Sequence, residues 1–368
     1  MDTSDPKITF DADGVCNHCR GYDKIAKEEL LPPDKAKKKL DEIVSEIRLT
    51  GKNNKYDCII GLSGGVDSTY LALLVKKLGL RPLAVHFDNG WNSELAVKNI
   101  ENIVNKLGID LFTYVINWEE FKDLQLAYLK ASVIDVEVPT DHLIFAVLYK
   151  LAKKNNVKFL LPGSNIVTEA VLPDAWIYKG KLDLVNLESI HKQFGTIRLK
   201  KFPKLGNIQR LYYINYYGLR SIPILNYVPY NKKEIKQTII TELDWKDYGG
   251  KHYESIFTRF YQGYILPVKF GVDKRKAHLS NLICSKQITR EEAMLELKKD
   301  GYDPLQLKID SEFVLKKFDL TQTEFDAIMQ LPVKQHSDYP TEKSIYENYT
   351  FIKPLKPIGD LLKKMFFS

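Results

Sequence analysis

The sequence predicts an α/β fold: a doubly wound, mostly parallel sheet with a short cysteine-containing head and a largely helical C-terminal part. Four short apolar runs, at 56–62, 81–87, 111–116 and 157–162, are rich in β-branched and aromatic residues and are typical of buried parallel strands. Amphipathic stretches separate them, at 66–79, 93–107, 119–130 and 139–155. Each is long enough to form the helix of a parallel crossover. Alternating strands and helices of this kind indicate a sheet covered on both faces.

Length and composition set the number of domains and the class of protein. The 368 residues are 44% hydrophobic, enough for about two domains with a sizeable core. We expect a head at 1–50, a nucleotide-binding domain at 51–175 and a substrate- or partner-binding region at 176–368. No apolar run approaches the roughly 20 residues that cross a bilayer, and the first residues do not resemble a signal peptide. We therefore expect a cytoplasmic protein without a membrane span.

The charge balance permits anionic ligands without demanding nucleic acid. The 54 basic and 47 acidic residues give a net charge of +7. The densest basic segments, 37–39 and 198–204, are short, and a solvated charged face is the preferred interpretation of both. A nucleic-acid binder would more often show a dense basic stripe. We expect no nucleic-acid partner.

Helical patterns are also visible outside the predicted sheet. In the charged segment 34–48, four apolar residues share one helical face (Leu40, Ile43, Val44 and Ile47). Thr289 precedes Glu292 by three residues and Thr321 likewise precedes Glu324, the capping-box pattern of a helix start. Six tyrosines between 212 and 230 suit a second core or an interface, or else stacking on a base. The last residues form a basic amphipathic tail with Leu361, Leu362, Met365 and Phe366.

One motif is specific. The segment 62–69, LSGGVDST, follows the first predicted strand and opens the first helix. Two glycines let the backbone approach an anion, and the N–H groups at the helix start point toward it. A carboxylate in such a cradle would repel phosphate unless Mg²⁺ accompanies it. The spacing is neither that of a Walker A loop nor that of a dinucleotide fingerprint. The residues therefore predict a phosphate-binding loop with Asp67 as the magnesium ligand. Set between a strand and a helix, the loop resembles the PP-loop of the ATP pyrophosphatases, and this resemblance implies ATP binding by Ser63, Gly64, Gly65, Val66, Asp67, Ser68 and Thr69, with Asp67 and Ser68 also catalytic.

Two further polar segments follow predicted strands. Ligands of such sheets bind outside the carboxyl ends of the strands. The second strand ends at His86 and Asp88, although Asp88 could equally be only a helix cap. The fourth runs into 162–169, PGSNIVTE, which holds more polar groups than a turn requires. The same PP-loop resemblance implies cofactor binding by His86, Asp88, Gly163, Ser164, Asn165 and Glu169, with Asn165 and Glu169 also contacting the second substrate.

A strand, SGGVDS and a helix together resemble the PP-loop of the ATP pyrophosphatases. Further segments, FDADGVCNHC, LPGSNIVTEA, ITREEA and much of 249–283, resemble the N-acetyl sugar amidotransferases of surface-polysaccharide pathways. That likeness runs from residue 2 to about 345. It implies that ATP adenylates the amide oxygen of an N-acetyl sugar, that ammonia displaces AMP to leave an acetamidino group, and that pyrophosphate is released. The sugar is expected to be nucleotide-activated.

The resemblance also implies partners. The chain has no Cys-His-Glu glutaminase pattern, so ammonia is expected from a separate glutaminase with a cyclase-like companion. Within 249–278, basic residues, histidines and acids concentrate. They could bind phosphates, a sugar carboxylate or departing pyrophosphate. The alternative is a charged helix that faces solvent and binds no ligand. We assign catalytic roles to Lys251, His252, Lys274 and Arg275, and substrate binding to Arg259 and His278.

Cysteine usage leaves a metal question open. Cys16 and Cys19 form a CxxC, which is half a zinc knuckle, whereas Cys58 is expected in the core and Cys284 is isolated in the sequence. The resembling family carries another CxxC before the segment that matches residues 1–6. We expect either a shortened start or a lost zinc site at Cys16 and Cys19.

Two other function classes remain. A PP-loop enzyme that modifies tRNA, by thiolation or lysidine-type ligation, would use the CxxC or Cys284 and the positive charge. A non-catalytic ATP-binding scaffold for a glutaminase would not need the carboxylate of Asp67.

Overall fold

The computed structural model describes residues 1–250 and 253–342. Within them, one parallel sheet of five strands has the order β3-β2-β1-β4-β5. The chain therefore runs outward from β1 to β3 and then returns to the other side of β1, as in a doubly wound fold. The strands are β1 (Cys58–Gly61), β2 (Pro82–Asp88), β3 (Asp110–Val115), β4 (Phe159–Leu161) and β5 (Arg220–Ser221).

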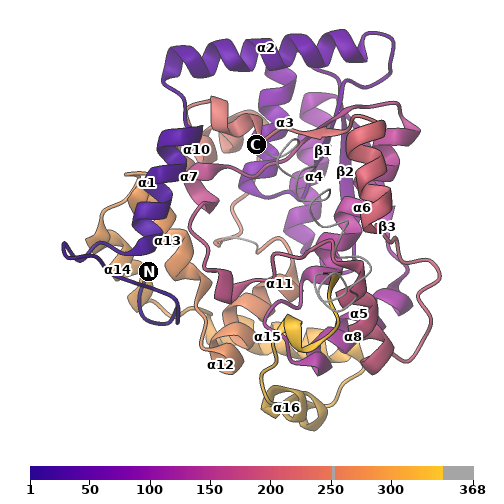
Figure 1. Cartoon of the computed structure of the whole chain (residues 1–368), viewed down its shortest axis with the longest axis vertical. Coiled ribbons are helices and arrows are strands. Elements are labelled where there is room, and N and C mark those ends of the chain that lie inside the picture. The colour runs from indigo at the N-terminus through magenta and orange to yellow at the C-terminus, as the bar shows by residue number, and fades with distance from the viewer. Residues whose placement is uncertain (251–252, 343–368) are drawn as a thin grey trace, which may run out of the picture.

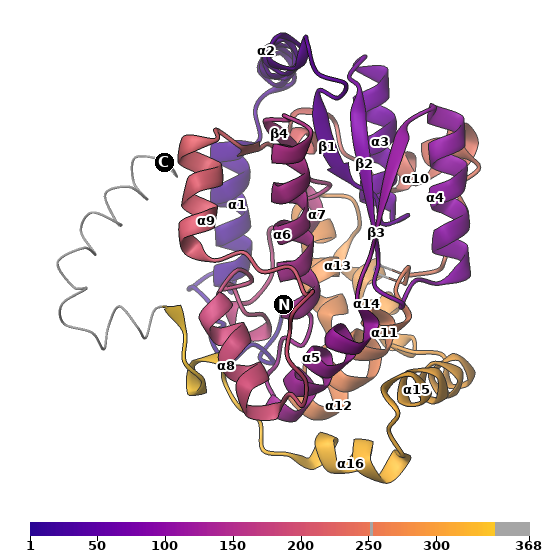
Figure 2. The ribbon, with the colours of Figure 1, turned by 90° about the vertical axis from the view of Figure 1, so that its right-hand side faces the viewer.

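Helices cover both faces of this sheet (Figure 1, Figure 2). The helices of the first half are α1 (Asn17–Glu29), α2 (Pro33–Gly51), α3 (Val66–Lys77), α4 (Glu94–Leu107), α5 (Trp118–Ala131), α6 (Val138–Lys154), α7 (Ile166–Glu169), α8 (Leu184–Phe194) and α9 (Asn207–Leu211). Those that follow are α10 (Lys232–Leu243), α11 (Ile256–Phe260), α12 (Leu266–Phe270), α13 (Lys274–Cys284), α14 (Arg290–Lys298), α15 (Pro304–Phe318) and α16 (Gln322–Gln330). Short 3₁₀ or π turns are Asp174–Trp176, Tyr212–Tyr216, Ile224–Tyr227, Tyr261–Ile265 and His336–Asp338.

Alternate residues of each strand enter two separate cores. Cys58 and Ile60 pack with apolar residues of α2, α3, α4 and α10, whereas Ile59 between them packs with α5, α6 and the C-terminal helices. This alternation follows from the two-residue period of a strand and confirms the doubly wound class. The four predicted strands and the four crossover helices appear within a few residues of their expected bounds.

Other helical predictions are also confirmed. The predicted apolar face of α2 is buried, and both capping boxes are present, at α14 and α16. The part after 175 is largely helical, but it also contributes β5 to the sheet. In the tyrosine-rich segment, Tyr230 is buried while Tyr216 is 83% exposed. The tail with Leu361, Leu362, Met365 and Phe366 lies outside the described residues.

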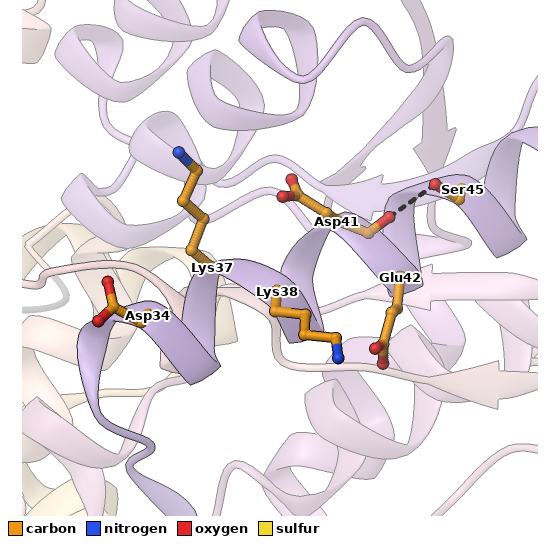
Figure 3. Close-up of a pocket in the computed structure, with 6 residues that line it drawn as sticks. All are labelled: Asp34, Lys37, Lys38, Asp41, Glu42 and Ser45. Carbon is orange, nitrogen blue, oxygen red and sulfur yellow. Dashed lines mark hydrogen bonds between the residues drawn. The ribbon is translucent and has the colours of Figure 1, made fainter.

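Two features of the described residues bear on the classes of function that the sequence left open. No helix in the described ranges combines the length and the apolar character that crossing a bilayer requires. A shallow hollow on α2 is lined by residues of both charges, and Figure 3 shows their side chains spreading away from the helix. The lysines of 37–39 therefore share this face with carboxylates, as expected of a solvated surface. The lining residues are Asp34, Lys37, Lys38, Asp41, Glu42 and Ser45.

Candidate active site

The glycine-serine loop lies between β1 and α3, at the carboxyl edge of the sheet. Gly64 has φ +81°, and a Cβ there would lie 2.8 Å from the carbonyl oxygen of Ala96 in α4. Gly65 is the N-cap of α3 and brings no side chain over the first turn. The indole nitrogen of Trp245 donates to the carbonyl of Gly64 at 2.8 Å. Glycine at 64 thus lets the loop lie close against α4, and Trp245 holds it from the other side.

The hydroxyls of the loop form a small network of their own. The backbone N–H of Gly65 donates to Ser63 Oγ at 3.3 Å, and the Oγ atoms of Ser63 and Ser68 are 3.1 Å apart. Thr69 Oγ1 donates to the carbonyl of Gly65 at 2.6 Å and is fully buried. Thr69 therefore stabilises the first turn, while Ser63 is exposed. Ser63 and Ser68 are the hydroxyls placed to meet an anion at this helix start.

Asp67 and two tyrosines from the C-terminal half surround the loop. The hydroxyl of Tyr230 donates to Asp67 Oδ1. Burial and the negative charge of Asp67 raise the pKa of Tyr230 well above its ordinary value, so Tyr230 stays a donor. The hydroxyl of Tyr248 lies 3.2 Å from the position of a Cβ on Gly65. Its pKa is raised by burial and then by the charges of Glu254 and Asp67.

The segment after β4 approaches the same helix start. A Cβ on Gly163 would lie 3.3 Å from the backbone nitrogen of Ser68. Asn165 caps α7 by accepting from the backbone of Thr168 at 3.0 Å, and its buried Nδ2 has no hydrogen-bond partner among the described residues. Ser164 and Glu169 are exposed, and the negative charge of Glu169 contributes to the raised pKa of Tyr230. The structure therefore brings both predicted polar loops together, and Tyr230 interacts with a carboxylate of each.

The end of β2 is held by protein contacts. One ring nitrogen of His86 lies 3.1 Å from the carbonyl of Leu62, and the other lies 3.1 Å from Asn92 Nδ2. Burial lowers the pKa of His86, which keeps the ring neutral. Asp88 accepts from the backbone of Gly90 at 3.0 Å. These bonds fix the turn after β2 beside the loop.

The described basic residues that were predicted as site residues in 249–278 each contact another side chain of the protein. Arg259 forms a two-pronged pair with Asp310, at 2.6 and 2.8 Å. Arg275 pairs with Asp273 at 2.8 Å, and His278 Nε2 lies 2.8 Å from Lys232 Nζ. The Lys274 ammonium lies 5.5 Å from the centre of the Tyr261 ring. Their predicted roles toward substrate stay predictions, and Lys251 and His252 lie outside the described residues.

A cluster of three charged residues that the sequence analysis missed, with Asp135 buried and Lys181 and Asp141 partly exposed, lies near the start of α6. Lys181 Nζ contacts Asp135 at 2.6 Å and Asp141 at 2.8 Å. Although burial alone would raise the pKa of Asp135, the charges of Lys181 and Lys274 lower it. Because α6 precedes β4, its first turn lies on the carboxyl side of the sheet (Figure 2). No local signal marks these residues, since they are brought together only by the fold.

The cysteines form a cluster rather than a demonstrated metal site. Cys16 Sγ lies 3.5 Å from Cys19 Sγ, and Cys284, isolated in the sequence, lies near enough to Cys19 for each thiol to shift the pKa of the other. Burial raises the pKa of Cys284 to about 12. Across residues 1–250 and 253–342, no group of three or more His, Cys, Asp or Glu is arranged to hold an ion. Zinc at Cys16 and Cys19 is therefore not supported.

Two family matches cover different parts of the chain. Residues 38–170 match the family described as NAD synthase. Residues 254–355 match the family described as LPS biosynthesis protein WbpG-like, C-terminal domain. The first match includes the loop after β1 and the segment after β4, and the second begins at Glu254.

Curated relatives are similar to different extents. An uncharacterised protein of Methanocaldococcus jannaschii is 24% identical over 306 residues, covering 79% of this chain and 88% of that protein. The GMP synthase [glutamine-hydrolyzing] of Thermosipho africanus is 32% identical over 137 residues, 34% of this chain and 25% of that enzyme. The tRNA(Ile)-lysidine synthase of Chlamydia pneumoniae is 37% identical over 70 residues, 18% of this chain and 22% of that enzyme. The last two therefore share only a segment with this chain.

Solved structures with detectable likeness include two synthetases. The NMN synthetase from Francisella tularensis has a TM-score of 0.34 and 14% identity, covering 79% of this chain and 98% of that one. The NH3-dependent NAD synthetase from Campylobacter jejuni has a TM-score of 0.31 and 14% identity, covering 83% and 99%. Scores this low leave the assignment to the two family matches.

Proposed function

The chain belongs to the PP-loop superfamily of ATP-using synthetases and carries a WbpG-like domain, and from this premise we propose that it amidates a sugar. ATP would adenylate the amide oxygen of an N-acetyl group on a nucleotide-activated sugar. Ammonia would then attack the amide carbon, AMP would leave, and an acetamidino group would remain. The observation that supports this most is the contact between the two parts: the first residue of the WbpG-like match lies at the phosphate loop.

The loop residues suit the adenylation step. The helix start at Gly65 and the hydroxyls of Ser63 and Ser68 would bind the β- and γ-phosphates, where negative charge grows as pyrophosphate departs. Carboxylate oxygens are the ligands that Mg²⁺ takes in nucleotide sites, so Asp67, oriented by Tyr230, fits that ion. Bound Mg²⁺ would neutralise phosphate charge. The loop and the segment after β4 would position the amide next to the α-phosphate.

The source of the ammonia depends on whether a cysteine of this chain can act as a glutaminase nucleophile. A glutaminase nucleophile works as a thiolate, and burial holds the Cys284 thiol protonated at neutral pH. We propose that a separate glutaminase, with a cyclase-like companion, delivers ammonia at the carboxyl edge of the sheet. The same protonated state argues against Cys284 as a sulfur carrier in tRNA thiolation. We propose a cytoplasmic location, where nucleotide sugars and ATP are available.

The test is a product assay on the purified chain. ATP, an ammonium salt and a panel of UDP- and CMP-linked N-acetyl sugars should give AMP, pyrophosphate and a sugar lighter by roughly one dalton, because NH replaces O. Glutamine should replace ammonium only when the partner glutaminase is added. Stoichiometric ADP, or AMP formation that requires tRNA instead of a sugar, would contradict the proposal.

A further inference from the structure

The WbpG-like region begins at a segment that pairs with the loop after β2. The backbone N–H of Ser93 donates to the carbonyl of Glu254 at 2.9 Å, and that of Ile256 donates to the carbonyl of Trp91 at 2.8 Å. Asn92 and Ser255 form an antiparallel bridge between them. Ser255 then caps α11 by accepting from Thr258 at 3.2 Å. These backbone hydrogen bonds therefore fix the position of the Glu254 backbone beside the loop after β2.

That side chain lies against the phosphate loop. Glu254 Oε1 is 3.3 Å from the position of a Cβ on Gly65, the residue that opens α3. The Tyr248 hydroxyl is 3.2 Å from the same position. Burial contributes most to the raised pKa of Tyr248, and the negative charges of Glu254 and Asp67 raise that pKa further. The first turn of α3 thus carries one carboxylate of its own, Asp67, and is approached by a second, Glu254, from a distant part of the chain.

A second carboxylate at this place conflicts with binding free phosphates. The helix start attracts anions, and a negative side chain beside it opposes that attraction. The conflict disappears when a divalent cation accompanies the nucleotide. Magnesium in nucleotide sites is held by one or two carboxylates together with phosphate oxygens, not by a complete protein cage. Such a site does not need three protein ligands gathered in advance.

We propose that Glu254 is a residue of the ATP site, binding the magnesium ion that arrives with the phosphates, opposite Asp67. The WbpG-like domain would then contribute to nucleotide binding directly, rather than only to recognition of the second substrate. This inference rests on the proposed use of Mg·ATP by the loop, but not on the identity of the sugar. Its test therefore measures nucleotide and metal binding alone.

The experiment compares Glu254→Gln with Glu312→Gln in the full chain. Gln keeps the shape of the side chain and removes its charge, and Glu312 is an exposed glutamate of α15 in the same domain. Calorimetry measures the ATP affinity of each protein with Mg²⁺ and with EDTA. Tryptophan fluorescence, measured in a background where Trp91, Trp118 and Trp176 are replaced by Phe so that only Trp245 at Gly64 reports, gives a second reading of occupancy. Urea unfolding of both variants controls for a change in fold.

The expected result has opposite signs in the two conditions. Glu254→Gln should weaken Mg·ATP binding about tenfold or more, the usual effect of disturbing a metal site. It should leave metal-free ATP binding equal or tighter, because a negative charge has gone. Glu312→Gln should match the wild type in both. Equal affinity for Mg·ATP in Glu254→Gln, or an equal loss in both conditions, would overturn the role. If no sugar is ever amidated, a Mg²⁺-specific loss would still support it.

Discussion

Gly64 offers a quantitative test of why the phosphate loop needs glycine. Its φ of +81° lies in the left-handed region, and a Cβ would lie 2.8 Å from the Ala96 carbonyl and 3.3 Å from Ile100 Cγ1. Gly218 has a similar φ of +74°, but no described atom lies within 4 Å of its Cβ position. The two alanine variants therefore share the backbone strain and differ in the contact with α4.

The magnitudes separate the two effects. Left-handed backbone costs a non-glycine residue about 1 kcal/mol or somewhat more, which is the expected loss for Gly218→Ala. Gly64→Ala adds an overpacking cost of about 1–3 kcal/mol, because the Ala96 carbonyl belongs to a helix and cannot move freely. We expect Gly64→Ala to lose about 2–4 kcal/mol in the free energy of unfolding. Its ATP affinity should also fall, while that of Gly218→Ala should not.

Urea unfolding of both variants gives the difference directly. The fluorescence difference between each variant and its Trp245→Phe counterpart reports the loop, because a displaced Gly64 carbonyl would leave the indole nitrogen of Trp245. Unfolding free energies that agree within about 0.5 kcal/mol would refute the reasoning. The close approach of the loop to α4 would then not be what demands glycine.

Two further predictions concern charge. Asp67→Asn should abolish most AMP formation while the far-ultraviolet dichroism stays unchanged, since Tyr230 can still bond the amide; a wild-type rate would place the metal ligand elsewhere. Burial lowers the pKa of His142 and of His336 from 6.5 to about 4. Between these values the unfolded chain binds protons that the folded chain does not, so stability falls as pH drops through that window. His336→Gln should remove about one proton from this dependence, measured as the slope of the unfolding free energy against pH. An unchanged slope would contradict it.

The sheet could be predicted because its information is local. Each long strand is a continuous apolar run, and each crossover helix has its own apolar face and cap. β5 was not predicted, since Arg220 and Ser221 are exposed and too few to show a period. Their pairing depends on β4, which the sequence places about sixty residues earlier.

The candidate site divides in the same way. The loop with Asp67 is a contiguous motif, and its place between a strand and a helix could be predicted because it depends on neighbours in sequence; the binding roles of its residues stay predictions. No role at the loop was predicted for Tyr230, Trp245 or Glu254, since each reaches it from more than 150 residues away. The tyrosine-rich segment and the block 249–278 stand out in the sequence, but nothing local links them to the loop. The roles assigned to the basic block stay predictions, because a run of cations in a sequence fits an anion site as well as it fits internal ion pairs such as that of Arg259 with Asp310.

The contacts at the sheet edge argue that the two halves work as one unit. The Trp245 indole donates to the Gly64 carbonyl after β1. The Lys317 ammonium of α15 donates to the Gly90 carbonyl after β2, and the same ammonium lies 4.6 Å from the centre of the Trp118 ring. Both anchors come from beyond residue 240, yet both act on turns that follow the first two strands. Cutting the chain near 175 would free these turns and remove β5. Nucleotide affinity should therefore depend on the part of the chain after residue 175 even where it does not contact ATP, because Trp245 and Lys317 hold the backbone of the two turns.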